Sequence, residues 1–337
     1  MNIFGKTLNE LQQILKNYNL PSYTAKQIVQ WIYNKNVYDI DLMTDISIKN
    51  RKLLKESLTI NHITPIEFQK SNDGTKKYLF KTEKGWYIET VMIPTDNRTT
   101  VCVSTQAGCG WGCKFCMTAK QGLQGNLTAG EILSQIVGIP EFKEVNRIVF
   151  MGMGEPLSNF EEVLKSIEIL TSEYGYNFSK NKITISTVGL LPEFAKLIEL
   201  NPCRIAISLH SPFPEERAKW MPVEKHTSII EIIKIIKDSK IYKKQRISFE
   251  YIMFDGKNDT PRHAKELGRL LNGLNCRVNL INYHEITNEE FKPANEKRIL
   301  EFQNILKSKN IITTIRKSRG KDIAAACGML STLLLKV

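Results

Sequence analysis

The chain has 337 residues, of which 42% are hydrophobic and 24% charged, as expected for a globular protein with one large and one small domain. Lys and Arg outnumber Asp and Glu by 47 to 35, and the net charge of +12 favours nucleic acid as a partner, although a Lys-rich composition bias would give the same excess. The sequence shows no signal peptide and no stretch near the roughly 20 apolar residues of a membrane span, so we expect a cytoplasmic protein with no membrane partner.

The first residues, 1–60, are predicted to form a small helical domain, because apolar residues recur at a helical period within 8–15 and 28–32. Residues 61–98 are predicted to be a β-rich connecting segment. Its strand-like stretches are 77–81 and 86–93, and Asp73-Gly74 is a turn signal just before the first of them.

From residue 99 onward, short apolar strands alternate with amphipathic helices of about ten residues. The predicted strands are 101–104, 147–151, 182–186, 204–208, 247–253, 277–281 and 311–315. This alternation predicts an α/β fold with a parallel sheet, closed fully or partly into a barrel or else doubly wound. In each case reactive side chains are expected on loops that follow the C-terminal ends of strands. The apolar stretch 229–241 is interrupted by charged residues, among them Glu231, Lys234, Lys237 and Asp238, and is predicted to be an amphipathic helix.

Three of the seven cysteines, Cys109, Cys113 and Cys116, lie in one C-x3-C-x2-C segment after the predicted strand 101–104. An odd cysteine count without a secretory signal favours metal or redox chemistry over a disulfide framework. Ordinary [4Fe–4S] clusters use four thiolates, so three would leave one iron open to the amino and carboxylate groups of S-adenosylmethionine (SAM). The alternatives are a zinc site that lacks a ligand, since no second Cys/His pair lies nearby, and three free thiols.

The segment 152–155 (GMGE) follows a predicted strand and combines a glycine turn with a carboxylate. A dinucleotide-binding fingerprint would need a third glycine where Leu157 stands, so such a site is disfavoured. SAM suits this turn, because the backbone at Gly154 allows close approach and Glu155 can accept a hydrogen bond from the SAM ammonium. The alternative is a plain strand-to-helix turn.

Several short motifs in one order give the chain a resemblance, nearly end to end, to the RlmN/Cfr family of radical SAM RNA methyltransferases. They are 27–33 (QIVQWIY), 73–80 (DGTKKYLF), 89–94 (ETVMIP), 102–116, 152–159 (GMGEPLSN), 186–189 (STVG), 208–210 (SLH) and 322–328 (DIAAACG). Within the family, the segments 73–80 and 116–119 (CMTA) and the residue Pro156 favour the RlmN branch over the Cfr branch.

The resemblance implies a radical SAM partial (β/α) barrel in residues 99–337, with residues 1–60 as an RNA-binding accessory domain. It implies a [4Fe–4S] cluster, two SAM molecules per turnover and an electron donor such as flavodoxin or ferredoxin. The implied substrates are 23S rRNA, at the peptidyl-transferase centre, and tRNA, next to the anticodon, each methylated at C2 of adenine. Two alternatives stay open: C8 methylation of 23S rRNA, as in the Cfr branch, and a non-catalytic, zinc-stabilised RNA-binding protein.

The resemblance also implies roles for individual residues. Cys109, Cys113 and Cys116 would bind the cluster, and the SAM contacts would be Gly154, Glu155, Ser186, Ser208, Leu209, His210 and His284. Cys327 would carry the methyl group as S-methylcysteine, and Cys102 would attack the Cys327 sulfur, releasing the product and leaving a disulfide. Glu89 would be the proton acceptor, although without the resemblance it would be interpreted as a solvated carboxylate.

Two positions depart from the family pattern: His284 stands where Asn is usual, and Ala324 where Asp is usual. The first affects a SAM contact and the second the positioning of Cys327. Cys203 and Cys276 match no motif and are predicted to be small buried hydrophobic residues. The basic clusters predicted to contact RNA phosphates are Lys240, Lys243, Lys244 and Arg246, and Arg316, Lys317, Arg319 and Lys321.

Overall fold

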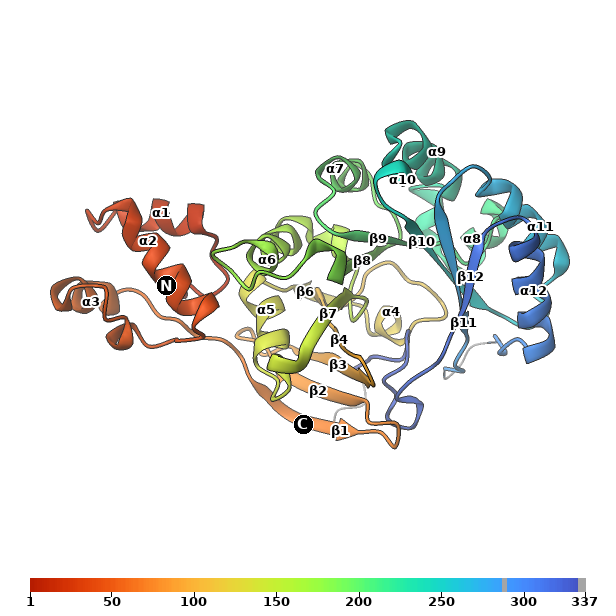
Figure 1. Cartoon of the computed structure of the whole chain (residues 1–337). Coiled ribbons are helices and arrows are strands. Elements are labelled where there is room, and N and C mark those ends of the chain that lie inside the picture. The colour runs from red at the N-terminus through yellow and green to blue at the C-terminus, as the bar shows by residue number, and fades with distance from the viewer. Residues whose placement is uncertain (287–289, 333–337) are drawn as a thin grey trace.

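The computed structural model describes residues 1–286 and 290–332, and within them one ten-stranded sheet forms the centre of the molecule (Figure 1). The strand order is β1-β2-β3-β4-β7-β8-β9-β10-β11-β12. The strands are β1 (Pro65–Lys70), β2 (Lys76–Lys81), β3 (Tyr87–Thr95), β4 (Arg98–Cys102), β7 (Val145–Phe150), β8 (Ile183–Thr187), β9 (Arg204–Ser208), β10 (Ile247–Met253), β11 (Cys276–Asn282) and β12 (Ile312–Arg316).

The strands from β4 to β12 pair in parallel, whereas β1 to β4 pair antiparallel. The parallel strands are short and rich in Ile and Val, as expected for strands that are covered on both faces. Because β1 and β12 are the two edges of the sheet and do not pair with each other, the sheet curves without closing. The predicted α/β partial barrel is therefore confirmed.

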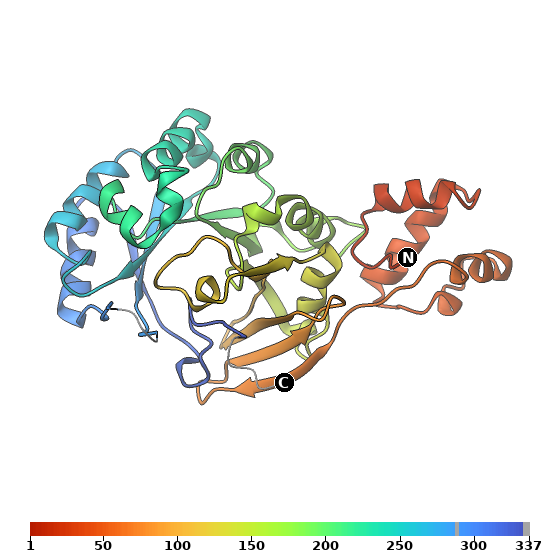
Figure 2. The same ribbon diagram turned by 180° about the vertical axis from the view of Figure 1, so that it is seen from behind.

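Helices cover the outer face of the curved sheet, and α4 with the loop before it lies across the inside of the curve (Figure 2). After β4 the helices are α4 (Met117–Gln121), α5 (Ala129–Val137), α6 (Phe160–Thr171), α7 (Glu193–Leu200), α8 (Pro214–Trp220), α9 (Ile229–Ser239), α10 (Ile241–Lys244), α11 (Pro261–Leu270) and α12 (Glu296–Ser308). The predicted amphipathic helix is confirmed as α9, which buries Ile229, Ile232, Ile233 and Ile236. No helix of the described ranges is long and apolar enough to cross a membrane.

The N-terminal helices stand beside the barrel as a separate lobe, as the red segments of Figure 1 show. They are α1 (Leu8–Lys16), α2 (Ser22–Val29), the π-helix η1 (Gln30–Asn34) and α3 (Ile48–Lys55), which confirms the helical prediction for this part of the chain. Contacts with the barrel include an ion pair of 3.0 Å between Glu10 and Lys165. Asn34 Nδ2 also donates to the carbonyl oxygen of Gly175 at 2.5 Å.

The remaining strands were found only in the structure. β1 follows the helical lobe and pairs with β2, although its sequence, PIEFQK, gave no clear strand signal. A separate two-stranded sheet is formed by β5 (Gln106–Gly108) and β6 (Leu123–Asn126), which flank the cysteine segment. Because β5 and β6 pair with each other, they hold the two ends of the cysteine segment together.

Candidate functional site

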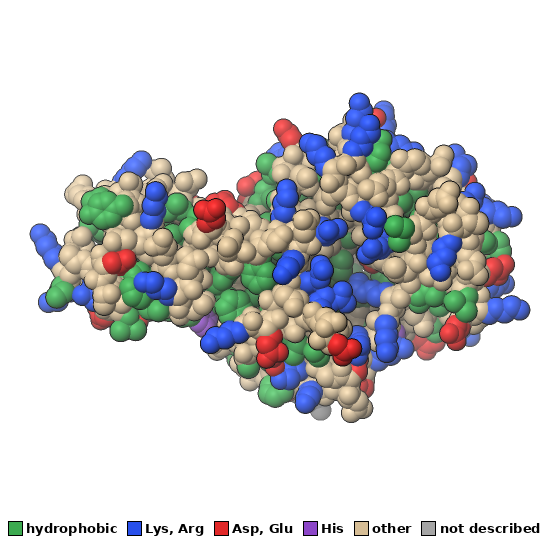
Figure 3. Space-filling view, in the orientation of Figure 1, with side chains coloured by type: hydrophobic (Ala, Val, Ile, Leu, Met, Phe, Trp, Pro, Cys, Tyr) green, Lys and Arg blue, Asp and Glu red, His purple; other side chains and the backbone are tan. Residues whose placement is uncertain are grey.

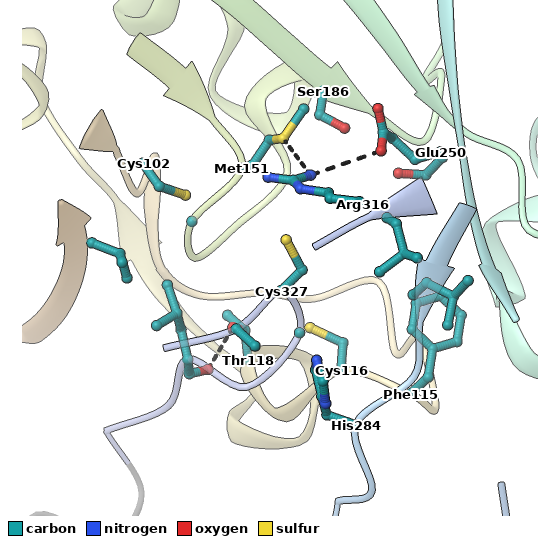
Figure 4. A pocket seen from close by; sticks show the side chains of 18 of the residues that line it. Cys102, Phe115, Cys116, Thr118, Met151, Ser186, Glu250, His284, Arg316 and Cys327 are labelled. Atoms are coloured by element: carbon teal, nitrogen blue, oxygen red, sulfur yellow. Dashed lines mark hydrogen bonds and ion pairs between the residues drawn. The ribbon is translucent and has the colours of Figure 1, made fainter. Parts of the chain in front are cut away.

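The curved sheet encloses a cavity of about 500 Å³ that brings together five of the seven cysteines (Figure 4). They are Cys102 at the end of β4, Cys109, Cys113 and Cys116 in the loop before α4, and Cys327 near the C-terminus. The cavity also touches residues at the ends of β7, β8, β9, β10, β11 and β12. The expectation that reactive residues follow the C-terminal ends of strands is met by this arrangement.

Residues 109–116, hereafter the cluster loop, are held by glycine backbone conformations and by one close approach. Gly108 has a φ of +78°, and a Cβ at this position would lie 1.7 Å from the carbonyl oxygen of Gly122. The Cys109 amide donates to that same oxygen at 3.1 Å. Gly112 also has a positive φ of +64°. These conformations let the loop turn tightly enough to present all three sulfurs to one space.

The cysteines of the cluster loop fit a [4Fe–4S] cluster better than a single zinc ion. In the part of the chain that the structure describes, no three His, Cys, Asp or Glu side chains are gathered tightly enough to hold one metal ion. A four-iron cluster is wider than one ion, and three thiolates around an open cavity suit it. Burial raises the pKa of all three thiols, to about 12 for Cys109, so the ligating thiolates require the positive charge of iron.

The glycine turn after β7 places Glu155 in the wall of the cavity. Gly154 has a φ of +94°, and a Cβ there would lie 2.5 Å from the Cβ of Gln106. The Glu155 carboxylate accepts hydrogen bonds from Leu157 N at 3.0 Å, Thr187 Oγ1 at 2.5 Å and Val188 N at 3.0 Å. Burial raises the pKa of Glu155 to about 7 in spite of these bonds. A cationic group such as an ammonium would restore the ionised form of this carboxyl.

Of the strand-end residues predicted to contact SAM, Ser186, Ser208 and His210 line the cavity, but Leu209 does not. Leu209 is fully buried, and its amide donates to the Glu250 carbonyl oxygen at 3.0 Å. His210 Nδ1 accepts from Ile252 N at 3.0 Å, so its neutral ring carries the hydrogen on Nε2. Burial and the nearby Arg217 lower the pKa of His210 to about 3, which keeps this histidine neutral.

Arg217 and Glu224 form a buried ion pair that the sequence did not reveal as part of the site. The Arg217 side chain donates to the carbonyl oxygens of Ser208 and Leu209, at 2.9 and 3.0 Å. These bonds fix the end of β9, where the predicted SAM contacts lie. The only sequence signal was a pair of opposite charges seven residues apart, which is too common to indicate burial.

His284, the position that departs from the family pattern, lines the cavity just after β11. Its Nε2 lies 2.8 Å from Ser318 Oγ. Burial lowers the pKa of His284, and the charge of Lys321 lowers it further, so a neutral ring is favoured. The imidazole therefore offers one donor and one acceptor, and Ser318 engages one of them.

Residues 319–328, hereafter the C-terminal loop, bring Cys327 to the cavity through contacts with the turn between β1 and β2. Asp322 accepts from Ser71 Oγ at 2.6 Å and from Asn72 N at 3.1 Å. Asp73 accepts from Gly320 N at 3.0 Å. The carbonyl oxygen of Gly328 also accepts from Met117 N at 2.7 Å, next to the last cysteine of the cluster loop. The motif at 73–80 thus supports the position of Cys327.

Arg316 and Glu250 join the site, although the sequence placed Arg316 only in a basic cluster and gave Glu250 no role. Arg316 ends β12 and points into the cavity, above Cys327 and to the right of Cys102 in Figure 4. Glu250 lies in the middle of β10 and is 4% exposed. A charged residue inside an otherwise apolar strand is a signal that sequence reasoning can use, because such residues are seldom buried without a partner. Arg316 is half-buried and pairs with Glu250 inside the cavity, which argues against its predicted phosphate role, whereas Lys317 and Arg319 of the same basic cluster line the cavity wall.

Glu89 lies outside the main cavity and lines a neighbouring one of about 330 Å³. It is 4% exposed, pairs with Lys77 Nζ at 2.8 Å and accepts from Ser331 N at 2.9 Å. Burial raises the pKa of Glu89 against the effect of Lys77. The interpretation of this residue as a solvated carboxylate is therefore wrong. Ala324 and Met329 of the C-terminal segment line the same neighbouring cavity.

The last two cysteines agree with their prediction. Cys203 and Cys276 are 2% and 5% exposed and lie outside the lining of the cavity. Cys203 immediately precedes β9 and Cys276 begins β11, and both pack into the hydrophobic core.

Comparisons with known proteins agree with this geometry. A model of the radical SAM superfamily matches residues 103–267, and a model of the ribosomal RNA large subunit methyltransferase N-terminal domain matches residues 1–60. A probable dual-specificity RNA methyltransferase RlmN of Phocaeicola vulgatus is 49% identical over 98% of this chain and 95% of its own length. The dual-specificity RNA methyltransferase RlmN of Syntrophus aciditrophicus is 39% identical over 98% and 96%. A radical SAM methyltransferase from Sphaerobacter thermophilus superposes with a TM-score of 0.90 at 39% identity, covering 98% of this chain and 99% of its own.

Proposed function

Because this chain belongs to the RlmN family of dual-specificity RNA methyltransferases, we propose that it methylates C2 of adenine in RNA inside the cavity of Cys327. The observation that carries the proposal is the meeting of two kinds of cysteine in one space. Cys109, Cys113 and Cys116 fit a cluster, while Cys102 and Cys327 remain as free thiols beside it. A protein that only needed a structural metal would have no use for the second pair.

A [4Fe–4S] cluster held by Cys109, Cys113 and Cys116 would, together with SAM, supply a carbon radical, which can attack the electron-poor C2 of adenine where an electrophilic methyl group cannot. The protein residues do the rest. Glu155, Ser186, Ser208 and His210 surround the space beside the cluster loop and would orient SAM. The carboxylate of Glu155 suits the SAM ammonium, since burial leaves it in need of a positive partner.

Cys327 would hold the methyl group, first as S-methylcysteine and then as the methylene bridge to adenine. Cys102 would attack the Cys327 sulfur to release the methylated base, leaving a Cys102–Cys327 disulfide for later reduction. Both thiols line the same cavity, and both sulfur atoms face the guanidinium of Arg316 (Figure 4). Glu89, which lines the neighbouring cavity, would take the C2 proton. Its carboxyl group is buried, and the raised pKa that results suits a proton acceptor.

RNA would reach the cavity through a basic opening. Figure 3 shows Lys and Arg side chains gathered around a hollow in the middle of the molecule. Arg98, Lys317 and Arg319 line the cavity, and a shallow groove beside it is lined by Arg98, Arg147 and Lys182. Phosphate contacts there would supply affinity, and the target adenine would leave its stack to enter. The cluster of Lys243 and Lys244 on α10 lines neither surface.

The proposed substrates are 23S rRNA, at the peptidyl-transferase centre, and tRNA, at the adenine next to the anticodon. The reaction would take place in the cytoplasm, with electrons from a donor such as flavodoxin or ferredoxin. Anaerobic turnover with each RNA, followed by mass spectrometry of the nucleosides, tests the function directly. 2-Methyladenosine supports it, 8-methyladenosine would move the chain to Cfr-type chemistry, and an unmodified RNA with zinc in the protein would overturn it.

The roles of the two free thiols can be distinguished by substituting each cysteine in turn. Cys102→Ala should accumulate protein joined covalently to RNA through Cys327, visible on denaturing gels as a shifted band that ribonuclease removes. Cys327→Ala should give neither the adduct nor the product, while the cluster still assembles. Cys203→Ala is the matched control, because it removes a buried cysteine outside the cavity. Wild-type turnover by Cys102→Ala would contradict the two-thiol mechanism.

The path of RNA is tested by comparing two charge reversals of equal size. Arg147→Glu with Lys182→Glu changes the groove beside the cavity, and Lys243→Glu with Lys244→Glu changes α10. We expect the first pair to weaken RNA binding more and to flatten its dependence on salt, because phosphate contacts release counterions. A larger loss from the α10 pair would place the RNA on the cluster seen in the sequence instead.

A further inference from the structure

The guanidinium of Arg316 is fixed in the cavity from two sides. Its Nη1 lies 3.6 Å from Met151 Sδ and 3.8 Å from Glu250 Oε2. Glu250 is itself held, because its Oε1 accepts from Asn279 Nδ2 at 2.7 Å. In Figure 4 the sulfur of Cys327 points toward the guanidinium from below, and the sulfur of Cys102 faces it from the left. A cation therefore faces both free thiols in the cavity.

We propose that Arg316 is a shared counterion that stabilises the thiolate of Cys327 when it accepts a methyl group and the thiolate of Cys102 when the product is released. The inference rests on the proposed function of these two cysteines. In the first step a Cys327 S–C bond forms as the methyl–sulfonium bond of SAM breaks, and Cys327 loses its negative charge. In the last step an S–S bond forms as the Cys327 S–C bond breaks, and the bonding pair leaves on carbon, which takes a proton.

The charges around the pair explain why one cation can serve both thiols in turn. Burial raises the pKa of Cys102 to about 12 and a Cys327 thiolate raises it further, whereas Arg316 lowers it. The other ionisable groups of the cavity wall are Arg98, Cys109, Cys113, Cys116, Glu155, His210, Glu250, His284, Lys317 and Arg319. Once Cys327 is a neutral thioether, the competing anion is gone and the charge of Arg316 is available to Cys102. Arg316 would thereby help to order the two steps, as a positioning residue rather than a reacting one.

The rate of alkylation of each cysteine by iodoacetamide tests this proposal on the cluster-loaded protein, kept anaerobic and without RNA. Peptide mass spectrometry assigns the rate to Cys327 or Cys102. At neutral pH, Arg316→Gln should slow alkylation of Cys327 by about tenfold, because loss of the cation disfavours the reactive thiolate, and the difference should shrink as pH rises. Arg316→Lys should recover most of the rate. Lys321→Gln is the control, because it removes one positive charge from the nearby C-terminal loop, at a position outside the cavity lining.

A second test asks whether the charge of Arg316 becomes available to Cys102 once Cys327 carries no charge. In Cys327→Ala, Cys102 should be alkylated faster than in the wild-type protein, and adding Arg316→Gln should cancel the gain. Glu250→Gln gives a further check if Arg316→Gln fails to fold, since it removes the acid beside Arg316 and should speed alkylation of Cys327. Unchanged rates in Arg316→Gln, or a Lys variant as slow as the Gln variant, would overturn the proposal. Alkylation needs no RNA. A failure to methylate RNA would therefore contradict the proposed function and leave the alkylation result unaffected.

Discussion

Two loops deliver sulfur atoms to the same cavity, and they are built in different ways. The cluster loop takes its shape from residues close in sequence, above all from Gly108, whose missing side chain lets the backbone meet Gly122. The C-terminal loop takes its position from a distant part of the chain, through the bonds of Asp73 to Gly320 and of Asp322 to Ser71. One loop is fixed locally, and the other is fixed by tertiary contacts.

The difference follows from what each loop has to do. A cluster requires three sulfurs at constant spacing, and a short motif with tight turns supplies it. Cys327 must react in turn with SAM, adenine and Cys102. Its loop therefore needs contacts that position it and still let it move. Asp322 and its partner Asn72 are exposed, although its other partner Ser71 is buried, whereas Gly108 is buried. We therefore expect changes in the cluster loop to act all or none and changes in the C-terminal loop to act by degrees.

The largest effect is expected from removal of a cluster ligand. Cys116→Ala should abolish the brown chromophore and reduce bound iron and sulfide from about four each per chain to a small fraction, because two thiolates cannot hold a [4Fe–4S] cluster. Cys276→Ala should keep the cluster, since Cys276 is buried outside the cavity. Metal analysis after anaerobic purification checks both. Full activity in Cys116→Ala with zinc bound would contradict the cluster assignment.

The next effect tests the local origin of the cluster loop. Gly108→Ala places a Cβ 1.7 Å from a backbone oxygen at a φ of +78°, so the loop must shift. We expect a loss of about 2–5 kcal/mol of unfolding free energy, or a failure to load the cluster. Gly110→Ala is the control in the same loop, because its Cβ would lie 3.7 Å from that of Leu123, an ordinary contact. Denaturant unfolding and iron content measure both, and equal effects would mean that close approach is not what shapes the loop.

Much of the fold could be predicted from the sequence because its signals are local. The alternation of Ile-rich strands with amphipathic helices placed the strands from β7 to β12 within two residues and β4 within three, and α9 was recognised from its spaced isoleucines. β1 was missed because most of its side chains are exposed and it is defined by pairing with β2. β5 and β6 were missed because three or four residues carry no period.

The site divides in the same way. The cluster loop could be identified from the spacing of its cysteines alone, and Glu155 from a glycine turn after a strand. Cys102 and Cys327 were assigned only by resemblance, since nothing in either segment shows that they meet. Arg316 was grouped with surface lysines because a sequence does not show which member of a basic run turns inward. Glu89 was interpreted from chemistry alone as solvated, and its burial depends on the segment around Ser331, far away in the chain.

A smaller effect tests the C-terminal loop at Ala324, where this chain departs from the family pattern. Ala324 has a φ of +51°, a conformation that disfavours a Cβ. Ala324→Gly should therefore raise the unfolding free energy by about 1 kcal/mol. Ala325→Gly should lower it by roughly 0.5–1 kcal/mol, because Ala325 is 7% exposed and is not in the left-handed region. Thermal and denaturant unfolding of the two variants should shift in opposite directions, and shifts of the same sign would mean that this loop does not hold Ala324 in the strained conformation.

The smallest effect concerns the anchor of the C-terminal loop under acid. Slight burial acts to raise the pKa of Asp73, but hydrogen bonds from Thr75 and Gly320 outweigh it and lower the pKa from 3.8 to about 2. A depressed pKa in the folded state means that the ionised carboxylate adds stability above the unfolded value, and that this contribution is lost as pH falls from about 4 to about 2. Asp73→Asn should be less stable than the wild-type protein at pH 6, and the gap should close toward pH 2. Asp96→Asn, at the exposed turn between β3 and β4, is the control. Hydrogen exchange of residues 319–328 should rise in Asp73→Asn at pH 6 and stay unchanged in Asp96→Asn, and a gap that persists at pH 2 would show that Asp73 anchors the loop by its shape and not by its charge.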